Sequence, residues 1–334
     1  MTDQLCFGGP AILHRIRADA IVGDQLEPAA GLLAASSRLP HISLACALPI
    51  NPAPGVPLPF LDWPFDSSHD GINKARGGQR VGDLLMRRHY NVISGWADRF
   101  DIGPRSTLID CLSPEAQIAQ VTRGFDFPRP EPIPFRAVGP IRSLQAPKVD
   151  VSLPFTPDGL RPLVFATMGT LQGGRLRVFK AIARACRAAG AELVVAHGGL
   201  LSKRQAESIG ADYVFDFVPQ REILTRAALC VSHAGLNTVM DCIAAAVPMI
   251  VRPIAFDQKG TTARILARQI GERMAPLWDR PALAAQVDRL LTSPDFPRRL
   301  DPLTAELRRA GGALSAADIV EGVLANVRTD EKRP

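Results

Sequence analysis

The feature that most constrains the fold is a regular alternation of apolar strands and amphipathic helices in the second half of the chain. Residues 162–168 (PLVFATM) are apolar throughout, as in a buried strand, and residues 175–189 repeat apolar side chains with helical spacing. Further apolar runs, each followed by a helical pattern, are ELVVA (192–196), YVFDF (213–217), LCVS (229–232) and PMIV (248–251). This alternation predicts an α/β domain whose parallel sheet lies between two layers of helices.

The first half repeats the alternation less regularly. We expect strands at 19–23 (DAIVG) and 41–45 (HISLA), a helix at 26–37 between them, and a longer helix at 79–100. A proline-rich loop at 49–64 is too long to be a simple connection between two elements.

Residues 128–157 are rich in proline and weak in periodicity, so we expect an interdomain linker there. A chain of 334 residues with 46% apolar residues is long enough for two domains of ordinary size. The expected division is an N-terminal domain with its linker at 1–145 and a C-terminal domain at 146–334.

The net charge and the distribution of basic residues limit the classes of partner that we expect. The formal net charge is +6 and the pI is about 9.2, which suits an anionic small ligand or an anionic membrane surface. The basic residues are scattered, and no motif interleaves them with aromatic residues. Nucleic acid is therefore not an expected partner.

The six cysteines form neither a Cys-x-x-Cys pair nor a metal-binding spacing with the histidines. This pattern is typical of a reduced, cytoplasmic protein and predicts no metal site. No signal peptide is recognisable, and the longest apolar stretch, 243–251, is short and interrupted by Pro248. Any membrane contact is therefore expected to be peripheral, on the inner face of the membrane.

The most informative segment covers residues 213–258. The strand LCVS ends in His-Ala-Gly, and a helix is expected to begin near Leu236 or Asn237. Gly235 lets a ligand approach the backbone closely, and the first N–H groups of the helix lack partners within it. Such a helix N-terminus binds anions, and a diphosphate fits it. His233 can donate to a phosphate oxygen, and Thr238 adds a hydroxyl group.

Further polar residues suit a sugar. Asp241 lies four residues after Asn237, at the exposed end of the same helix face, where its carboxylate can accept both hydroxyls of a ribose. Asp257 and Gln258 follow the next strand at its carboxyl end, where ligands bind in open α/β sheets. Together these residues predict a nucleotide-sugar pocket.

Each of these residues also has a purely structural interpretation. His233 alone could be a hydrogen-bonded residue at a strand end, Asp241 a solvated helix residue, and Asn237 or Thr238 a helix cap. The order and spacing of the whole set favour the nucleotide-sugar pocket. The sequence has neither a G-x-G-x-x-G motif nor a Walker lysine loop.

The segment FVPQ…VSHAGLNTVMDCIAAAVPMIVRPIAFDQ resembles the donor-binding signature of the UDP-glycosyltransferases. The resemblance implies a GT-B fold, with two facing Rossmann-like domains of which the N-terminal one is incomplete here. It implies base and ribose contacts for Phe217, Val218, Gln220 and Asp241, diphosphate contacts for Gly169, Thr170, His233, Asn237 and Thr238, and sugar contacts for Asp257 and Gln258. Phe217 and Asp241 differ from the family pattern, since plant members usually have Trp and many members have Glu there.

Segments outside this signature resemble the zeaxanthin glucosyltransferase group of the family, among them ISLACALPINPAPGVPLPFLDWPFD, CLSPEAQIAQ, FDFPR and TMGTLQGG. The resemblance covers essentially the whole chain. It implies an inverting transferase that moves glucose from UDP-glucose to a hydroxyl of a carotenoid such as zeaxanthin. UDP-glucose is then a donor substrate, and no cofactor or metal is expected.

The resemblance also implies a catalytic role for Asp24, as the aspartate that orients a histidine base. From the residues alone, Asp24 could instead cap a helix that begins at residue 26, with Glu27 completing a capping box. His14 is the only histidine that precedes Asp24, and it lies in a helix-like segment rather than after a strand. The base is therefore expected outside this sequence.

From this we expect that Met1 is an internal methionine of a longer protein and that the strand at 20–23 is an unpaired, aggregation-prone sheet edge. We further expect this chain to bind UDP without turning over UDP-glucose. The proline-rich loop is expected to dock on a membrane or, alternatively, to be an ordinary packed loop; its apolar residues are Leu58, Phe60, Leu61 and Trp63.

Three other interpretations stay open. The chain could be a catalytically silent UDP-sugar-binding fragment or scaffold, or a UDP-glycosyltransferase with another lipophilic acceptor. A UDP-sugar epimerase shares the fold but is disfavoured, because the acceptor-domain segments resemble those of transferases.

Overall fold

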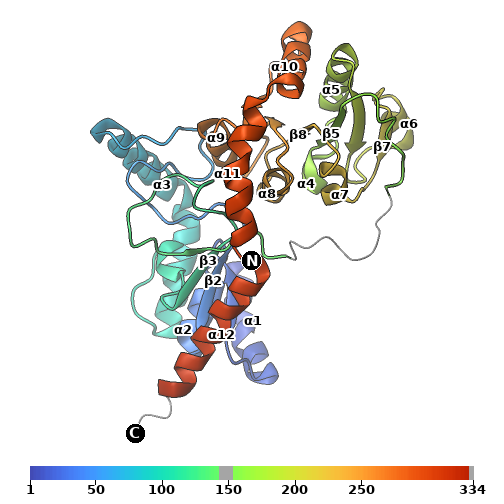
Figure 1. Ribbon diagram of the computed structural model, residues 1–334. Helices are drawn as coiled ribbons and strands as arrows, with labels where there is room; N and C mark the ends of the chain where they lie inside the picture. Colours follow the sequence, from blue (N-terminus) through green and yellow to red (C-terminus); the bar gives the residue numbers. More distant parts are fainter. Residues whose placement is uncertain (143–152, 331–334) are drawn as a thin grey trace. The chain divides into compact units, whose positions relative to one another are not determined.

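The computed structural model describes residues 1–142 and 153–330, which form two compact units (Figure 1). Unit 1 consists of Met1–Leu58, Phe65–Ser143 and the chain from Ala310 on. Unit 2 consists of Pro59–Pro64 and Leu144–Arg309. The expected linker at 128–157 falls partly on residues 143–152, which lie outside the described residues.

This division differs from the expected domains at 1–145 and 146–334 in two places. The C-terminal helix belongs to unit 1, because Ala316 and Val323 pack against Ile42 and Ile118 of its sheet. The short segment Pro59–Pro64 belongs to unit 2, where the Pro59 carbonyl accepts a hydrogen bond from the Gly260 N–H at 3.0 Å.

Unit 1 is built on a four-stranded parallel sheet with the order β1–β2–β3–β4. Within the described residues β1 pairs with β2 alone, so it forms a sheet edge as expected, and its Val22 is 54% exposed. The strands are β1 (Ile21–Asp24), β2 (His41–Ala45), β3 (Ala116–Ala119) and β4 (Arg136–Ala137). The helices are α1 (Thr2–Ile16), α2 (Ala29–Ser37), α3 (His69–Phe100) and α12 (Gly312–Asp330), with a 3-10 turn, η1 (Ile109–Cys111).

The first three helices of unit 1 share one core. Cys6 of α1, Leu32 of α2 and Ile93 of α3 are buried against one another. Trp96 of α3 joins them, and its indole Nε1–H donates to Asp3 Oδ1 at 2.7 Å. The carboxyl-terminal half of α3 is therefore firmly anchored.

Unit 2 is built on a six-stranded parallel sheet with the order β10–β9–β8–β5–β6–β7. The strands are β5 (Leu163–Thr167), β6 (Glu192–Ala196), β7 (Tyr213–Phe215), β8 (Leu229–Ser232), β9 (Met249–Val251) and β10 (Gly271–Arg273). The helices are α4 (Gly169–Gln172), α5 (Leu176–Ala188), α6 (Lys203–Glu207), α7 (Gln220–Leu224), α8 (Leu236–Ala244), α9 (Gln258–Ala267), α10 (Arg280–Thr292) and α11 (Asp295–Arg309). Central strands are buried on both faces, which is why they are apolar throughout.

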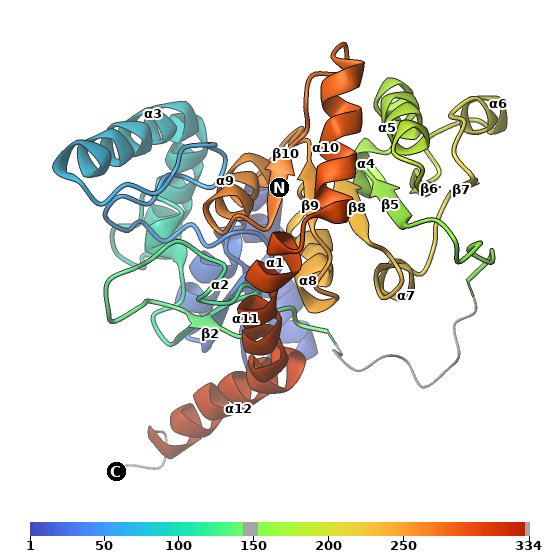
Figure 2. The same cartoon turned by 45° about the horizontal axis from the view of Figure 1, so that its top comes forward.

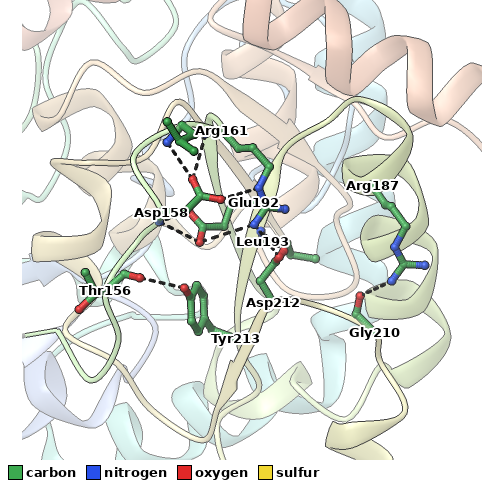
Figure 3. Close-up of polar contacts among 10 residues, drawn as sticks. Thr156, Asp158, Arg161, Arg187, Glu192, Leu193, Gly210, Asp212 and Tyr213 are labelled. Atoms are coloured by element: carbon green, nitrogen blue, oxygen red, sulfur yellow. Dashed lines mark hydrogen bonds and ion pairs between the residues drawn. The ribbon is translucent and has the colours of Figure 1, made fainter.

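A polar network ties the amino ends of three of these strands together (Figure 3). Arg161, just before β5, binds Asp158 at 2.6 Å and Asp212 at 2.9 Å. Hydrogen bonds from the Arg161 backbone and side chain hold the pKa of Asp158 at about 2. The buried carboxylate of Glu192 accepts the Asp158 N–H at 3.2 Å. The amino ends of β5, β6 and β7 are thus held together by ion pairs and hydrogen bonds.

Two helix boundaries differ from the expected ones. Helix α3 begins at His69 rather than at residue 79, because Ser68 caps it by accepting the Gly71 N–H at 3.1 Å. Helix α2 begins at Ala29 rather than at residue 26. None of the helices in the described part of the chain has the length and apolar character to cross a bilayer.

Candidate functional site

The loops that carry the predicted donor residues start at one edge of the unit 2 sheet. All six strands are parallel, so their carboxyl ends meet at the same edge. The loops after β5, β7, β8 and β9 contain the positions predicted to bind the phosphates, the base and the sugar. This is the edge at which open α/β sheets bind ligands.

The imidazole of His233 lies directly against two glycines. A Cβ atom on Gly169 would lie 2.7 Å from the His233 Cε1 atom, and one on Gly235 would lie 2.6 Å from its Nε2 atom. Gly169 also has a φ of +70°, which L side chains rarely adopt. The loop after β5 and the loop after β8 therefore meet around this ring, as the donor-site prediction requires.

Burial lowers the pKa of His233 to about 4. The ring is therefore neutral at pH 7 and can donate a hydrogen bond from one of its nitrogens. Within the described residues its buried Nδ1 has no hydrogen-bond partner. A neutral donor next to a helix N-terminus suits a diphosphate oxygen.

Helix α8 begins directly after this loop, at Leu236, as predicted. Its N-cap is Gly235, and no side chain caps the helix, so the capping interpretation of Asn237 and Thr238 is wrong. The turn before it is tight: Ala234 has a φ of +65°, and its N–H donates to the Ser232 hydroxyl at 3.2 Å. The N-terminus of α8, the positive end of the helix dipole, thus follows the His233 loop directly, and such a position suits an anion.

Gln220 connects two of the predicted donor residues. Its Nε2 donates to Asp241 Oδ2 at 2.7 Å, and its Oε1 accepts from the Thr238 hydroxyl at 3.3 Å. Asp241 is 5% exposed, so its expected position at an exposed helix end is wrong. Helix α8, which carries Asp241, packs against α7. Gln220 at the start of α7 covers the Asp241 carboxylate and fixes its direction.

Phe217 lies in the loop after β7 and is 67% exposed, while Val218 beside it is half-buried. An exposed aromatic ring in this loop suits stacking on a base. The ring lies beside Gly199, where a Cβ atom would be 3.7 Å from its Cε2. Asn237 and Thr170 are also exposed at this edge.

Sequence reasoning missed a histidine that supports the Phe217 loop. His197 follows β6 and is buried; its Nδ1 accepts the Leu201 N–H at 3.3 Å, so Nε2 carries the proton and lies 3.0 Å from Asp216 Oδ1. Gly173 lies against the His197 carbonyl, which leaves no room for a Cβ atom. The signal was the HGGL sequence directly after a strand.

Asp257 and Gln258 lie where β9 is followed by α9. Asp257 is the half-buried N-cap residue of that helix. Gln258 is buried, and its Oε1 accepts the N–H groups of Ile254 and Ala255, both at 2.8 Å. The side-chain carbonyl oxygen of Gln258 therefore shapes the loop between β9 and α9.

Asp24 ends β1 in unit 1, as predicted. Its carboxylate accepts the Leu26 N–H at 2.7 Å, so it fixes a turn, and the helix-capping interpretation is wrong because α2 begins at Ala29. The Cys46 thiol lies near this carboxylate, and their polar interaction contributes to the raised pKa of that thiol. His14 lies in α1, in agreement with the expected helical segment.

No group of three or more His, Cys, Asp or Glu side chains suited to a metal ion occurs within residues 1–142 and 153–330.

Comparisons with known proteins agree with this architecture. Residues 177–300 match the glycosyltransferase family 28 C-terminal domain. The solved glycotransferase of kitacinnamycin has a TM-score of 0.75 at 21% identity, with 96% of this chain and 80% of that chain covered. The fold and the site at its sheet edge define a glycosyltransferase of the GT-B class.

Two relatives identify the family. The chain is 40% identical to zeaxanthin glucosyltransferase of Pantoea ananas over 97% of its own length and 76% of the relative. It is equally similar to zeaxanthin glucosyltransferase of Pseudescherichia vulneris, with 97% of the chain and 78% of the relative covered. The chain belongs to the zeaxanthin glucosyltransferase family.

Proposed function

We propose that this protein is an inverting glucosyltransferase that moves glucose from UDP-glucose to a hydroxyl of a carotenoid such as zeaxanthin. The observation that carries the proposal is the contact of His233 with Gly169 and Gly235, in a chain whose relatives over almost its whole length are zeaxanthin glucosyltransferases. The proposed reaction uses UDP-glucose as donor substrate and no separate cofactor or metal.

In this proposal the acceptor oxygen attacks the anomeric carbon of glucose while the bond from that carbon to the β-phosphate oxygen breaks. The N-terminus of α8 and the His233 donor stabilise the charge that develops on UDP. A base takes the proton of the acceptor hydroxyl, and Asp24 orients that base. Phe217 stacks on uracil, Asp241 binds the ribose, and Asp257 and Gln258 bind the sugar.

We also propose that the enzyme works at the inner face of the cytoplasmic membrane, because a carotenoid acceptor partitions into the bilayer. The net charge of +6 favours an anionic surface. In this arrangement the donor comes from the cytoplasm and the acceptor from the lipid phase.

Calorimetry with UDP tests the donor site. His233→Ala removes a hydrogen-bond donor to a charged phosphate, which should weaken UDP binding by about 1.5–3 kcal/mol. Unchanged affinity in His233→Ala would contradict the phosphate assignment.

A transfer assay with UDP-glucose and zeaxanthin in detergent micelles, run with and without EDTA, tests the reaction. EDTA-resistant formation of the glucoside by this chain supports the proposal and contradicts the expectation that the base lies outside this sequence. UDP binding without transfer would favour the alternative of a silent donor-binding protein, and transfer only to other lipophilic alcohols would favour a different acceptor.

A further inference from the structure

The long helix α3 has two different halves. Its carboxyl-terminal half carries Ile93, Trp96 and Ala97 into the core of unit 1. In its amino-terminal half the buried residues are two glycines, Gly71 and Gly82. In Figure 2 this half, drawn in blue, lies at the edge of unit 1 and away from strand β2. The first turns of α3 thus present most of their side chains to solvent.

An apolar stripe runs along this exposed half. Val81, Leu84 and Leu85 are 59%, 68% and 76% exposed. Their spacing of three and four residues places them side by side on one face of the helix. Single exposed apolar side chains are ordinary on protein surfaces, whereas a contiguous group of them is typical of an interaction surface.

Arginines surround this stripe. Arg88 lies two turns after Val81 on the same face, while Arg80 and Arg87 line one flank and Arg76 extends that flank by one turn. All four are exposed, and none forms an ion pair within the described part of the chain.

Two acidic residues lie in this half of α3: Asp70 is in the first turn, about three turns before Val81, and Asp83, next to the stripe, points elsewhere. Asp83 is half-buried and accepts hydrogen bonds from Gln79 Nε2 at 2.9 Å and from the Tyr90 hydroxyl at 3.1 Å. It therefore does not neutralise the arginines on the opposite face. The exposed face combines apolar side chains with positive charge.

We propose that this face of α3, formed by Val81, Leu84 and Leu85 with Arg76, Arg80, Arg87 and Arg88, docks on the surface of an anionic lipid bilayer. Leucines at the boundary between headgroups and acyl chains, with arginines paired to lipid phosphates, are how amphipathic helices lie in a membrane interface. The docking surface would bring the proposed enzyme to an acceptor in the bilayer. That role of the surface rests on the proposed function.

This surface fits a membrane better than the proline-rich loop at 49–64 does. Of Leu58, Phe60, Leu61 and Trp63, Phe60 is the exposed residue, at 46%, and the other three are partly buried. The expectation that the loop itself docks is therefore replaced by docking through α3.

Flotation with phosphatidylcholine vesicles, with and without phosphatidylglycerol, tests the proposal. The parent protein should bind the vesicles that contain phosphatidylglycerol at low salt. The double variant Leu84→Ser/Leu85→Ser should lower the partition coefficient at least about tenfold. The triple variant Arg80→Gln/Arg87→Gln/Arg88→Gln should lower it about a hundredfold and weaken its salt dependence.

Two control variants accompany these. Leu160→Ser changes a leucine that is 91% exposed in unit 2, and Phe60→Ser changes the proline-rich loop; both should bind vesicles like the parent. All variants should keep the thermal midpoint and the UDP affinity of the parent, because none of the changed side chains packs in a core or lies at the donor site.

The proposal is overturned if the parent does not bind at low salt, if the α3 variants bind as well as the parent, or if Phe60→Ser alone abolishes binding. It is also overturned if light scattering finds a dimer that Leu84→Ser/Leu85→Ser converts to a monomer, because the face would then cover a second copy. Vesicle binding without glucose transfer in micelles would contradict the proposed function and leave the docking surface standing.

Discussion

A Cβ atom on Gly235 would lie 2.6 Å from the Nε2 atom of His233. Real Cβ atoms do not approach another heavy atom so closely, so a side chain at this position must displace the imidazole or the start of α8. Gly235 is also the N-cap residue of that helix. The absence of a side chain at Gly235 therefore lets the His233 ring and the start of α8 lie next to each other.

Gly235→Ala should weaken UDP binding at least about tenfold, or about 1.4 kcal/mol, because the ring moves away from the diphosphate. Gly174→Ala is a matched control in the same unit, since its Cβ would meet nothing closer than the Leu200 carbonyl at 3.6 Å. Calorimetric titration of both variants with UDP measures the effect. Equal affinity in the two variants would argue that His233 does not contact the nucleotide.

The stability of the protein should depend on pH through His233. Its pKa is about 4 in the folded state and 6.5 in the unfolded chain, so the unfolded state binds more protons between these values. The free energy of unfolding should therefore fall as the pH drops from 6.5 to about 4, by up to roughly 3 kcal/mol.

Urea unfolding of the parent and of His233→Gln across this pH range measures the contribution. The difference between the two proteins is the relevant quantity, because burial also lowers the pKa of His41 in unit 1. If the free energy of unfolding changes with pH in the same way in the parent and in His233→Gln, the ring is solvated rather than buried.

How far the fold could be predicted depended on burial. The strands β5, β6 and β8 are buried along their whole length, and a continuous apolar run predicts such strands correctly. Strand β10 (GER) was missed, because it joins the sheet through its backbone and has no apolar run. The start of α3 was missed because Gly77 and Gly78 lower the helical propensity of its first turns.

Contacts between residues far apart in the sequence could not be predicted from local sequence patterns. Helical periodicity predicts α12, but it does not tell which sheet the helix covers, and α12 packs on unit 1. At the site, the resemblance to the UDP-glycosyltransferases implied a common place for Gly169 and His233, which lie together in the structure. The hydrogen bond from Gln220 to Asp241 joins α7 to α8, and the contact of His197 with Asp216 joins two loops; no spacing in the sequence encodes either.

Gln220→Glu should destabilise both the fold and the donor site. It replaces the Nε2 donor, which lies 2.7 Å from the buried Asp241 Oδ2, by a second carboxylate. We expect a loss of about 1–3 kcal/mol in the free energy of unfolding, and weaker UDP binding. Gln205→Glu is the matched control, because position 205 completes a capping box in which Glu serves as well as Gln. A Gln220→Glu protein as stable as Gln205→Glu would contradict the contact.

The last prediction concerns Asp24 and the thiol beside it. Partial desolvation of the Cys46 thiol, followed by the polar interaction with Asp24 and its negative charge, raises the pKa of Cys46 to about 12, although the residue as a whole is exposed. Cys46 is the exposed cysteine, and the other five are buried, so a thiol reagent should label it first. Labelling at pH 8 should nevertheless be slow, because little thiolate is present.

Asp24→Asn removes the negative charge but keeps an oxygen that can accept the Leu26 N–H and so preserves the turn. The pKa of Cys46 should fall, labelling should become severalfold faster, and its pH–rate profile should shift to lower pH. Asp19→Asn, which removes an exposed charge before the same strand, should leave the rate unchanged. If both variants label at the parent's rate, Asp24 does not contact Cys46; if both label faster, the effect is general electrostatics, since removing either charge then acts alike.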